Sequence, residues 1–311
     1  MSWRGWVAGG VVVVGLLTGV ALWRAVAAAP APAQAPPAVE RAVAAGRTVY
    51  ATHCAVCHGE SGAGDGPSAA GFATKPSNLT DPLVGRMPDE YLASVIVHGG
   101  PAEGLAPTMP PFRGHLSDAQ VGELIAFIRT LSGLPHDFRA PPVVTVPGAP
   151  VQPIFFSHLV HATRYEIACQ YCHADSRRST SAGLPSVQRC LGCHTIIGAQ
   201  DNPEIMKIHE YARRGEPIPW VRIFKVPEFT YFPHKPHVRV DVECQTCHGP
   251  IERMRVVGAR TGPQIANDLL HLLGFRPAPP PLSMGWCIDC HRVQNRTRDL
   301  QAPLDCLTCH H

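Results

Sequence analysis

The first hydrophobic stretch of the chain is an uninterrupted apolar run rather than an amphipathic one. Residues 6–23 carry no charge, have Trp at both ends and are flanked by Arg4 and Arg24. This length just spans a bilayer core, and Trp prefers the two interfaces, so the run predicts a retained transmembrane anchor. The alternative is a cleaved signal peptide, because small-residue cleavage sites follow within residues 25–29. In either case the Ala- and Pro-rich residues 25–37 predict an extended tether.

Amphipathic helical patterns begin after this tether. Apolar residues recur at helical spacing from Val39 to Tyr50, and Gly46 lies among them. A glycine inside a helix costs about 1 kcal/mol unless something packs closely against it. Gly46 therefore predicts a close crossing with another helix, at Phe127 or a neighbouring residue.

Two further helices are expected in the same part of the chain. One should cover residues 89–97. The other should cover residues 117–131, since Ser117 and Gln120 form a capping-box pattern, one broad face is apolar, and Gly133 follows.

Composition limits the kind of protein this is. The chain has 311 residues, of which 45% are hydrophobic and 16% charged, with a formal net charge of +3. That balance is typical of a folded or partly membrane-bound protein and gives no basic surface for nucleic acid. Since 32 residues are Pro and only 10 are Phe, the side chains alone form a poor core, and something else must fill the interior.

The cysteines supply that missing element. All 12 lie in C-x-x-C pairs, and His follows every pair. Zinc ribbons and redox C-x-x-C sites require no adjacent His, and six such histidines by chance have a probability of order one in ten million. Numbered in chain order, the motifs are Cys54, Cys57 and His58 (motif 1); Cys169, Cys172 and His173 (motif 2); Cys190, Cys193 and His194 (motif 3); Cys244, Cys247 and His248 (motif 4); Cys287, Cys290 and His291 (motif 5); and Cys306, Cys309 and His310 (motif 6).

This spacing is that of c-type haem attachment. Two thiols three residues apart can add to the two vinyl groups of one porphyrin, and the following imidazole then binds the iron. The sequence thus predicts six covalently attached c-type haems. Such attachment takes place outside the cytoplasmic membrane, so the haem-bearing part is expected in the periplasm.

Residues 38–136, which include motif 1, resemble a class I cytochrome c. The resemblance is carried by the stretch R-A-V-A-A-G-R-T-V-Y-A-T-H-C-A-V-C-H-G and by the later A-P-T-M-P-P-F-R-G-H-L-S-D. It implies that the first and last helices cross and that a loop methionine, Met109, is the sixth ligand of the iron. Met87 is the alternative, but it lies at a helix start, where packing is the simpler role.

Beyond a Pro-rich linker at residues 137–150, a short repeat introduces two of the motifs. Phe156-Ser-His158-x-x-His161 precedes motif 2, and Phe232-Pro-His234-x-x-His237 precedes motif 4. A zinc site is a weak interpretation, since no third ligand keeps its offset in both copies. The pattern is similar to class III multihaem cytochromes. The resemblance implies that His158 and His234 bind the haem of the motif that follows, and His161 and His237 that of a neighbouring motif.

One distal ligand remains open in residues 151–311. Five proximal histidines need five partners, and the two pairs supply four. We expect Met284, close to Cys287, to be the fifth. The other candidates are His271, His209 and His311, followed by Met206 and Met254, and without any of these one haem would be five-coordinate.

The expected fold class is mainly α. One transmembrane helix precedes a class I cytochrome c domain at 38–136 and a five-haem, class III-like domain at 151–311 with sparse secondary structure.

The run I-P-W-V-R-I-F-K-V-P-E-F-T-Y-F-P-H-K-P-H and the later P-L-S-M-G-W-C-I-D-C-H resemble the pentahaem subunit of alternative complex III. That family of membrane complexes transfers electrons from quinol to an acceptor. The resemblance implies partners that include an iron-sulfur, quinol-oxidising subunit, and a soluble cytochrome or terminal oxidase as acceptor. Here a monohaem domain is fused ahead, and residues 258–281 form an insertion.

The sequence therefore predicts an electron conductor in the cytoplasmic membrane with no catalytic chemistry of its own. A methionine ligand raises haem potential relative to two imidazoles, so electrons should run from the five-haem part to the Met109 haem. The alternatives are a self-sufficient multihaem quinol dehydrogenase, a reductase of small oxyanions, for which no C-x-x-C-K site exists, and a metal-reducing conduit.

Overall fold

A computed structural model describes residues 37–134, 138, 140–198, 201–258 and 282–310. The predicted anchor and tether, most of the 258–281 insertion, His271 and His311 lie outside these ranges. Among the described residues, no helix is long and apolar enough to cross a bilayer.

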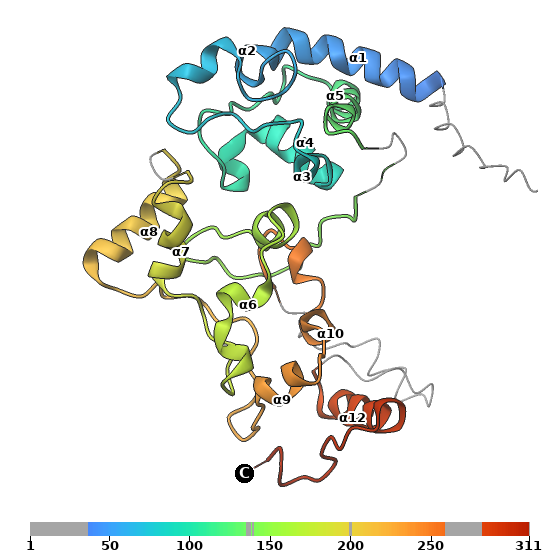
Figure 1. Cartoon of the computed structure of the whole chain (residues 1–311), viewed down its shortest axis with the longest axis vertical. Coiled ribbons are helices and arrows are strands. Elements are labelled where there is room, and N and C mark those ends of the chain that lie inside the picture. Colours follow the sequence, from blue (N-terminus) through green and yellow to red (C-terminus); the bar gives the residue numbers. More distant parts are fainter. Residues whose placement is uncertain (1–36, 135–137, 139, 199–200, 259–281, 311) are drawn as a thin grey trace, which may run out of the picture. The chain divides into compact units, whose positions relative to one another are not determined.

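The described residues form helices joined by irregular segments, so the mainly α prediction is confirmed; their only β-structure is isolated bridges. The N-terminal part, up to residue 134, contains seven helical segments, and Figure 1 shows α1 and α5 lying across each other. These segments are α1 (Pro37–His53), α2 (Ala55–His58), η1 (Pro67–Gly71), α3 (Pro82–Gly85), α4 (Asp89–His98), η2 (Gly100–Glu103) and α5 (Asp118–Leu131).

Beyond residue 138 the helices are mostly short, and irregular segments join them. Several of them begin or end at the cysteines of a haem motif, so the motifs organise this part of the chain. The segments are η3 (Leu159–Arg164), a π-helix, α6 (Cys169–Cys172), η4 (Ala174–Arg177), α7 (Val187–His194), α8 (Pro203–Arg214), α9 (His234–Arg239), α10 (Cys244–His248), η5 (Ile251–Arg253) and α12 (Met284–Arg298).

The crossing of α1 and α5 depends on Gly46. A Cβ atom at Gly46 would lie 2.0 Å from the backbone oxygen of Glu123, so only a glycine lets the two helices approach this closely. One turn further on, the rings of Tyr50 and Phe127 have centroids 5.2 Å apart. The predicted close crossing is confirmed, with Glu123 rather than Phe127 as the neighbour of Gly46.

Gly46→Val is expected to destabilise the N-terminal part by about 1–3 kcal/mol or more, because the new side chain meets helix backbone that cannot rotate away. Denaturant unfolding of the haem-loaded protein measures this. Gly122→Ala on the open side of α5 is the matched control, since a Cβ there meets nothing within 4 Å. It should stabilise the helix by roughly 1 kcal/mol. Equal stability of the two variants would contradict the role of Gly46.

The main core lies around these helices. Met87 is 1% exposed there and packs with Tyr91 and Leu124, as the packing role predicted for Met87 requires. The capping box of α5 is also present, with the Ser117 backbone N–H donating to Gln120 Oε1 at 2.9 Å and the Gln120 N–H donating to Ser117 Oγ.

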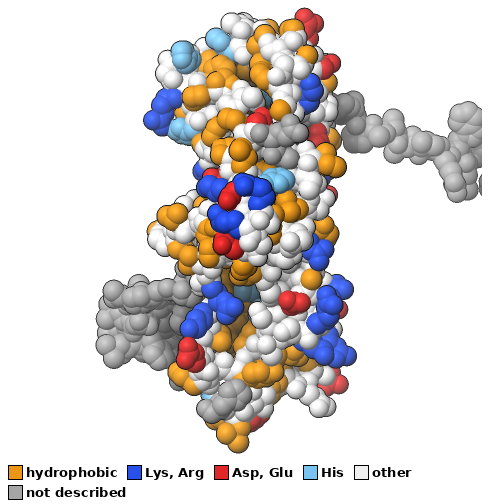
Figure 2. Space-filling model, turned by 90° about the vertical axis from the view of Figure 1, so that its left-hand side faces the viewer, with side chains coloured by type: hydrophobic (Ala, Val, Ile, Leu, Met, Phe, Trp, Pro, Cys, Tyr) orange, Lys and Arg blue, Asp and Glu red, His pale blue; other side chains and the backbone are white. Residues whose placement is uncertain are grey.

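The part beyond residue 138 has a smaller core of its own. Ile154, Val187, Ile208 and Ile218 form its buried centre. Figure 2 shows apolar side chains interspersed with charged ones on the surface. Val151, Ile196 and Leu307 are 92%, 85% and 85% exposed, which agrees with the poor supply of core-forming side chains in the sequence.

Candidate haem sites

Helical turns position the two cysteines of most motifs. α6 and α10 begin at the first cysteine of motifs 2 and 4, while α7 and α12 carry motifs 3 and 5. Residues three apart in a helix lie on the same face, so both thiols of a motif are directed to one side. That arrangement suits the attachment of one porphyrin edge.

Motifs 1 and 6 depart from this helical pattern. In motif 1, Cys54 directly precedes α2 and only Cys57 lies within that helix. In motif 6, Cys306 and Cys309 lie in a bend and a turn rather than in a helix. All 12 cysteines fall within the described ranges and none forms a disulfide, so each thiol is available for a porphyrin.

Four proximal histidines each face a histidine from the predicted distal set. Two imidazoles on opposite sides of one metal ion, each bound at about 2 Å, have ring centres roughly 6 Å apart. The observed ring centroids are 6.0–6.4 Å apart in the pairs His158–His173, His161–His194, His234–His248 and His237–His291. The residues present therefore fit iron bound by two imidazoles at motifs 2 to 5.

Backbone carbonyls hold the other nitrogen of most of these rings. A metal-binding histidine usually donates its second N–H in this way, which leaves Nε2 free for the metal. The Nδ1–oxygen distances are 3.0 Å for His58–Ser77, 2.8 Å for His173–Gly183, 3.0 Å for His194–Ile197, 2.6 Å for His291–Pro303, 2.9 Å for His161–Ser157, 2.7 Å for His234–Thr180 and 2.8 Å for His237–Pro233.

Burial also favours the neutral imidazole that a metal requires. Burial, together with the neighbouring His173 and His161, lowers the pKa of His158 to about 4. Burial likewise lowers the pKa values of His58, His161, His237 and His248.

A phenylalanine ring packs on both histidines of each H-x-x-H pair, a role that the sequence alone did not assign. The Phe156 ring stacks on His161 at 4.3 Å between centroids and meets His158 edge-on at 4.9 Å. Phe232 contacts His237 at 4.7 Å and His234 at 5.0 Å with closely similar angles. The phenylalanine two residues before each pair thus fixes both imidazole planes, and its recurrence at this offset was the available signal.

The two thiols of motif 1 are half-buried at the end of α1. Burial, together with the neighbouring Cys57, raises the pKa of Cys54 to about 11. The Gly66 N–H donates to the Cys57 carbonyl at 3.1 Å, and a Cβ at Gly66 would lie 2.6 Å from the carbonyl carbon of Cys57. The loop that follows the motif is therefore held tightly against it. Cys54 and Cys57 lie side by side, as the predicted attachment of a single haem requires.

The other groups of motif 1 are a tyrosine and the two candidate methionines. Tyr50 Oη donates to the Gly59 carbonyl at 2.6 Å and ties α1 to the end of the motif. Met109 is half-buried in the loop before α5, where its carbonyl accepts from the Gly100 N–H at 3.0 Å. Met87, the alternative ligand, is enclosed by the core.

Motif 6 has no paired histidine among the described residues. His310 Nδ1 is 3.4 Å from the Phe229 carbonyl. Met284 is 66% exposed as the first residue of α12, whereas Met254 is 2% exposed in the interior. The Nε2 atom of His209 is engaged with the His194 carbonyl at 2.9 Å.

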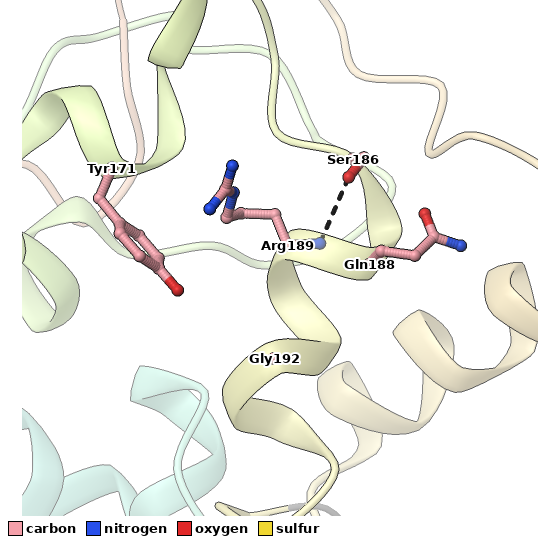
Figure 3. A pocket seen from close by; sticks show the side chains of 5 residues that line it. All are labelled: Tyr171, Ser186, Gln188, Arg189 and Gly192. Atoms are coloured by element: carbon pink, nitrogen blue, oxygen red, sulfur yellow. Dashed lines mark hydrogen bonds between the residues drawn. The ribbon is translucent and has the colours of Figure 1, made fainter.

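Neighbouring thiols show which motifs are adjacent. Burial raises the pKa of Cys190, and Cys172 of motif 2 raises it further. Burial and then Cys169 raise the pKa of Cys244, which connects motif 2 to motif 4. Figure 3 shows Tyr171, which lies between the cysteines of motif 2, on the same side as Arg189, which precedes Cys190 of motif 3. The Arg189 guanidinium lies 5.0 Å from the ring centre of Tyr171.

The same relation continues toward the C-terminus. Burial, together with Cys287 and Cys290 of motif 5, raises the pKa of Cys247 to about 11. Burial raises the pKa of Cys287, and Cys290 and then Cys309 of motif 6 raise it further. The spatial succession is therefore motif 3, 2, 4, 5, 6, which differs from the order along the chain.

Motif 1 is next to the start of this succession. Arg164 Nη2 donates to Ser77 Oγ at 3.3 Å, and the carbonyl of the same serine accepts from His58. Arg164 ends η3, the π-helix that carries His161. In the described part of the chain no three His, Cys, Asp or Glu side chains converge in a way that would hold a single metal ion, as a zinc site would require.

Comparison with known proteins relates two parts of the chain to cytochrome c families. Residues 41–128 match the family Cytochrome C oxidase, cbb3-type, subunit III, and residues 230–311 match Cytochrome c7 and related cytochrome c. The chain is a multihaem c-type cytochrome. This cytochrome carries multiple c-type haems and transfers electrons.

Three similar proteins illustrate its relationships. The cytochrome is 28% identical over 166 residues to the multihaem cytochrome c subunit of menaquinone reductase from Nitratidesulfovibrio vulgaris, which covers 51% of this chain and 76% of that one. It is 29% identical over 174 residues to the Cbb3-type cytochrome c oxidase subunit FixP of Sinorhizobium medicae, covering 52% of each chain. A chain of the Kuenenia stuttgartiensis reducing HAO-like protein complex matches 43% of this cytochrome and 67% of its own length, with 24% identity and a TM-score of 0.28.

Proposed function

We propose that this cytochrome is a hexahaem, membrane-anchored electron conductor. It accepts electrons from a quinol-oxidising membrane complex of the alternative complex III type and passes them through motifs 6, 5, 4, 2 and 3 to motif 1. From there they leave to a periplasmic cytochrome or terminal oxidase. The observation that carries the proposal is the continuous succession of motifs with four facing histidine pairs.

The proposed ligands follow from these distances. His158 and His173 hold the haem of motif 2, His161 and His194 that of motif 3, His234 and His248 that of motif 4, and His237 and His291 that of motif 5. Bound haem iron supplies reversible one-electron transfer. The two histidines of each H-x-x-H pair serve two different motifs, so the helix between them keeps those motifs at a fixed separation.

The direction of transfer rests on motif 1. Cys54 and Cys57 are the proposed attachment points of its haem and His58 and Met109 the proposed ligands, and a thioether ligand raises haem potential relative to two imidazoles. Motif 1 is then the end at which electrons leave. Residues 38–136 remain the proposed monohaem domain, residues 151–311 the pentahaem domain, and the anchor at residues 6–23 would keep both on the periplasmic side.

A second candidate is the opposite direction, with electrons delivered to a quinone. It is favoured by the similarity to the menaquinone reductase subunit. Purification of the native membrane complex tests both candidates, since a quinol-oxidising iron-sulfur subunit should co-purify and added quinol should reduce motif 1. Reduction of the quinone by the pre-reduced complex, with no reverse reaction, would favour the second candidate.

The exported protein is expected to carry six haems, because each of the six motifs has both thiols and a proximal histidine. Intact-mass measurement of fully matured protein should show six haem additions. Four or fewer additions would contradict the hexahaem assignment.

Met284 is the proposed distal ligand of motif 6. Cys287, one turn along α12, neighbours Cys309 of motif 6, and the exposed Met284 side chain is free to turn toward it. Met284→Leu removes the sulfur but keeps a similar volume. The spectrum of the variant should gain a high-spin component equivalent to one haem in six, whereas an unchanged low-spin spectrum would shift the assignment to His271 or His311.

A further inference from the structure

The segment that carries Met109 is a closed loop. In residues 99–109, called here the Met109 loop, the N–H of Gly100 donates to the Met109 carbonyl at 3.0 Å, and the Leu105 N–H donates to the Gly100 carbonyl at 2.9 Å. A Cβ at Gly100 would lie 2.3 Å from the Ala106 carbonyl oxygen, so the loop has no room to tighten there. Any displacement of its middle part is therefore passed on to Met109.

A buried carboxylate lies in the middle of this loop. Glu103 ends η2 and is 1% exposed. Its Oε1 atom lies 2.7 Å from Nη2 of Arg255, which also donates to the Ala102 carbonyl at 3.2 Å. Burial raises the pKa of Glu103, while Ser94 and then Arg255 beside it lower that pKa. Arg255 is therefore the cation that compensates for the burial of this carboxylate among the described residues.

Two more residues from beyond position 150 contact the same loop. Asn202 Nδ2 donates to the Gly104 carbonyl at 2.5 Å, while Oδ1 of the same side chain caps α8 by accepting from the Glu204 N–H at 2.9 Å. The Phe155 ring packs against Gly104, where a Cβ would be 2.9 Å from the ring. Asn202 and Phe155 thus hold the loop from the same side as Arg255.

We propose that Arg255 and Glu103 are positioning residues for haem ligation at motif 1: the ion pair holds the Met109 loop closed, so a residue of the pentahaem part stabilises the sulfur ligand of the monohaem part. The inference rests on the proposed role of Met109. Opening the loop would separate Glu103 from the only cation that pairs with it in the described structure, and the exposed ion pairs of the chain carry no comparable penalty. The attachment of the two parts and the ligation of motif 1 are thereby coupled.

The test is displacement of Met109 by added imidazole in the ferric holoprotein, followed at the sulfur-to-iron charge-transfer band. Imidazole binds when the loop opens, so its apparent affinity reports the open fraction. Arg255→Gln should bind imidazole at least tenfold more tightly than the unmodified protein. Glu103→Gln should show a smaller increase, because Arg255 is partly solvated and tolerates the loss of its partner better than the buried carboxylate does. Arg255→Lys should restore part of the difference.

The double variant Glu103→Gln/Arg255→Gln separates pairing from general damage. If the two residues act as a pair, its imidazole affinity should rise less than the two single effects combined predict. Arg86→Gln and Glu166→Gln are matched controls, since this 3.3 Å ion pair also joins the two parts of the chain but is 52% and 65% exposed. Both should bind imidazole like the unmodified protein, and intact mass should show full haem content in every variant.

Two outcomes are decisive. If the unmodified protein has the band, and all Arg255 and Glu103 variants bind imidazole with unchanged affinity or the same affinity as the controls, the positioning role is overturned. If the unmodified protein has no such band, Met109 is not a ligand and the proposed assignment of motif 1 fails at an earlier step.

Discussion

Met109→His is expected to lower the midpoint potential of the haem at motif 1 on the order of 0.1–0.3 V, a substantial part of the roughly 0.8 V over which axial ligands set haem potentials. The physical reason is that a thioether stabilises ferrous iron relative to an imidazole. A shift of 59 mV corresponds to a factor of ten for one electron. The equilibrium constant for electron transfer from motifs 2 to 5 to motif 1 would therefore fall by about fiftyfold or more. Electron delivery to the acceptor should slow, while reduction by the quinol side continues.

A redox titration that resolves the individual haems measures this effect. Met87→Leu is the matched control, because Met87 is buried in the core at 1% exposure and the change keeps its volume. It should leave all potentials in place. A shift confined to the other five haems in Met109→His, or a larger shift in Met87→Leu, would show that the ligand of motif 1 has been misassigned.

His158→Leu and His161→Leu should each produce one high-spin haem, but at different motifs. The ring of His158 faces His173 and that of His161 faces His194, so the first variant should affect motif 2 and the second motif 3. Each variant should gain a high-spin component of one haem in six and an open position that binds cyanide or carbon monoxide. Electron transfer along the succession should be slowed in both variants, because motifs 2 and 3 lie between motif 1 and motif 4.

Assignment to a motif requires combination with cysteine variants. His158→Leu should add no high-spin signal when Cys169 and Cys172 are replaced as well, and His161→Leu should add none when Cys190 and Cys193 are replaced. His115→Leu is the control, since that histidine is exposed and lies outside every facing pair. If the high-spin signal of His158→Leu disappears with the cysteines of motif 3, or that of His161→Leu with the cysteines of motif 2, the facing rings do not share an iron.

Several features of this protein follow from local sequence alone. The C-x-x-C-H spacing predicts where haems attach because both thiols and the imidazole belong to one short turn of the chain. Gly46 and the Ser117–Gln120 capping box are equally local, since a helix interior tolerates glycine only at a close approach and a helix start needs its free N–H groups bonded. The mainly α class of fold could therefore be predicted.

The pairing of histidines could be anticipated only through resemblance to other multihaem cytochromes. His158 and His161 are three residues apart, and no periodicity tells which later motif each one faces. The π-helical turn between them directs the two rings to different partners, and Phe156 keeps both planes in place. These orientations depend on side-chain packing, which the spacing does not encode.

The tertiary structure alone decided three further features. Motif 3 lies beside motif 2 on the side away from motif 4, so the spatial succession departs from the order in the chain. Arg255 pairs with Glu103 across more than a hundred intervening residues, and Arg164 contacts Ser77 beside the ligand of motif 1. The sequence by itself determined where the C-x-x-C-H motifs lie and where helices begin, because those are short-range matters of covalent spacing and backbone hydrogen bonding. Which groups meet across long separations depended on packing, since burial of a charge or an imidazole is stable only where a distant part of the chain supplies its partner.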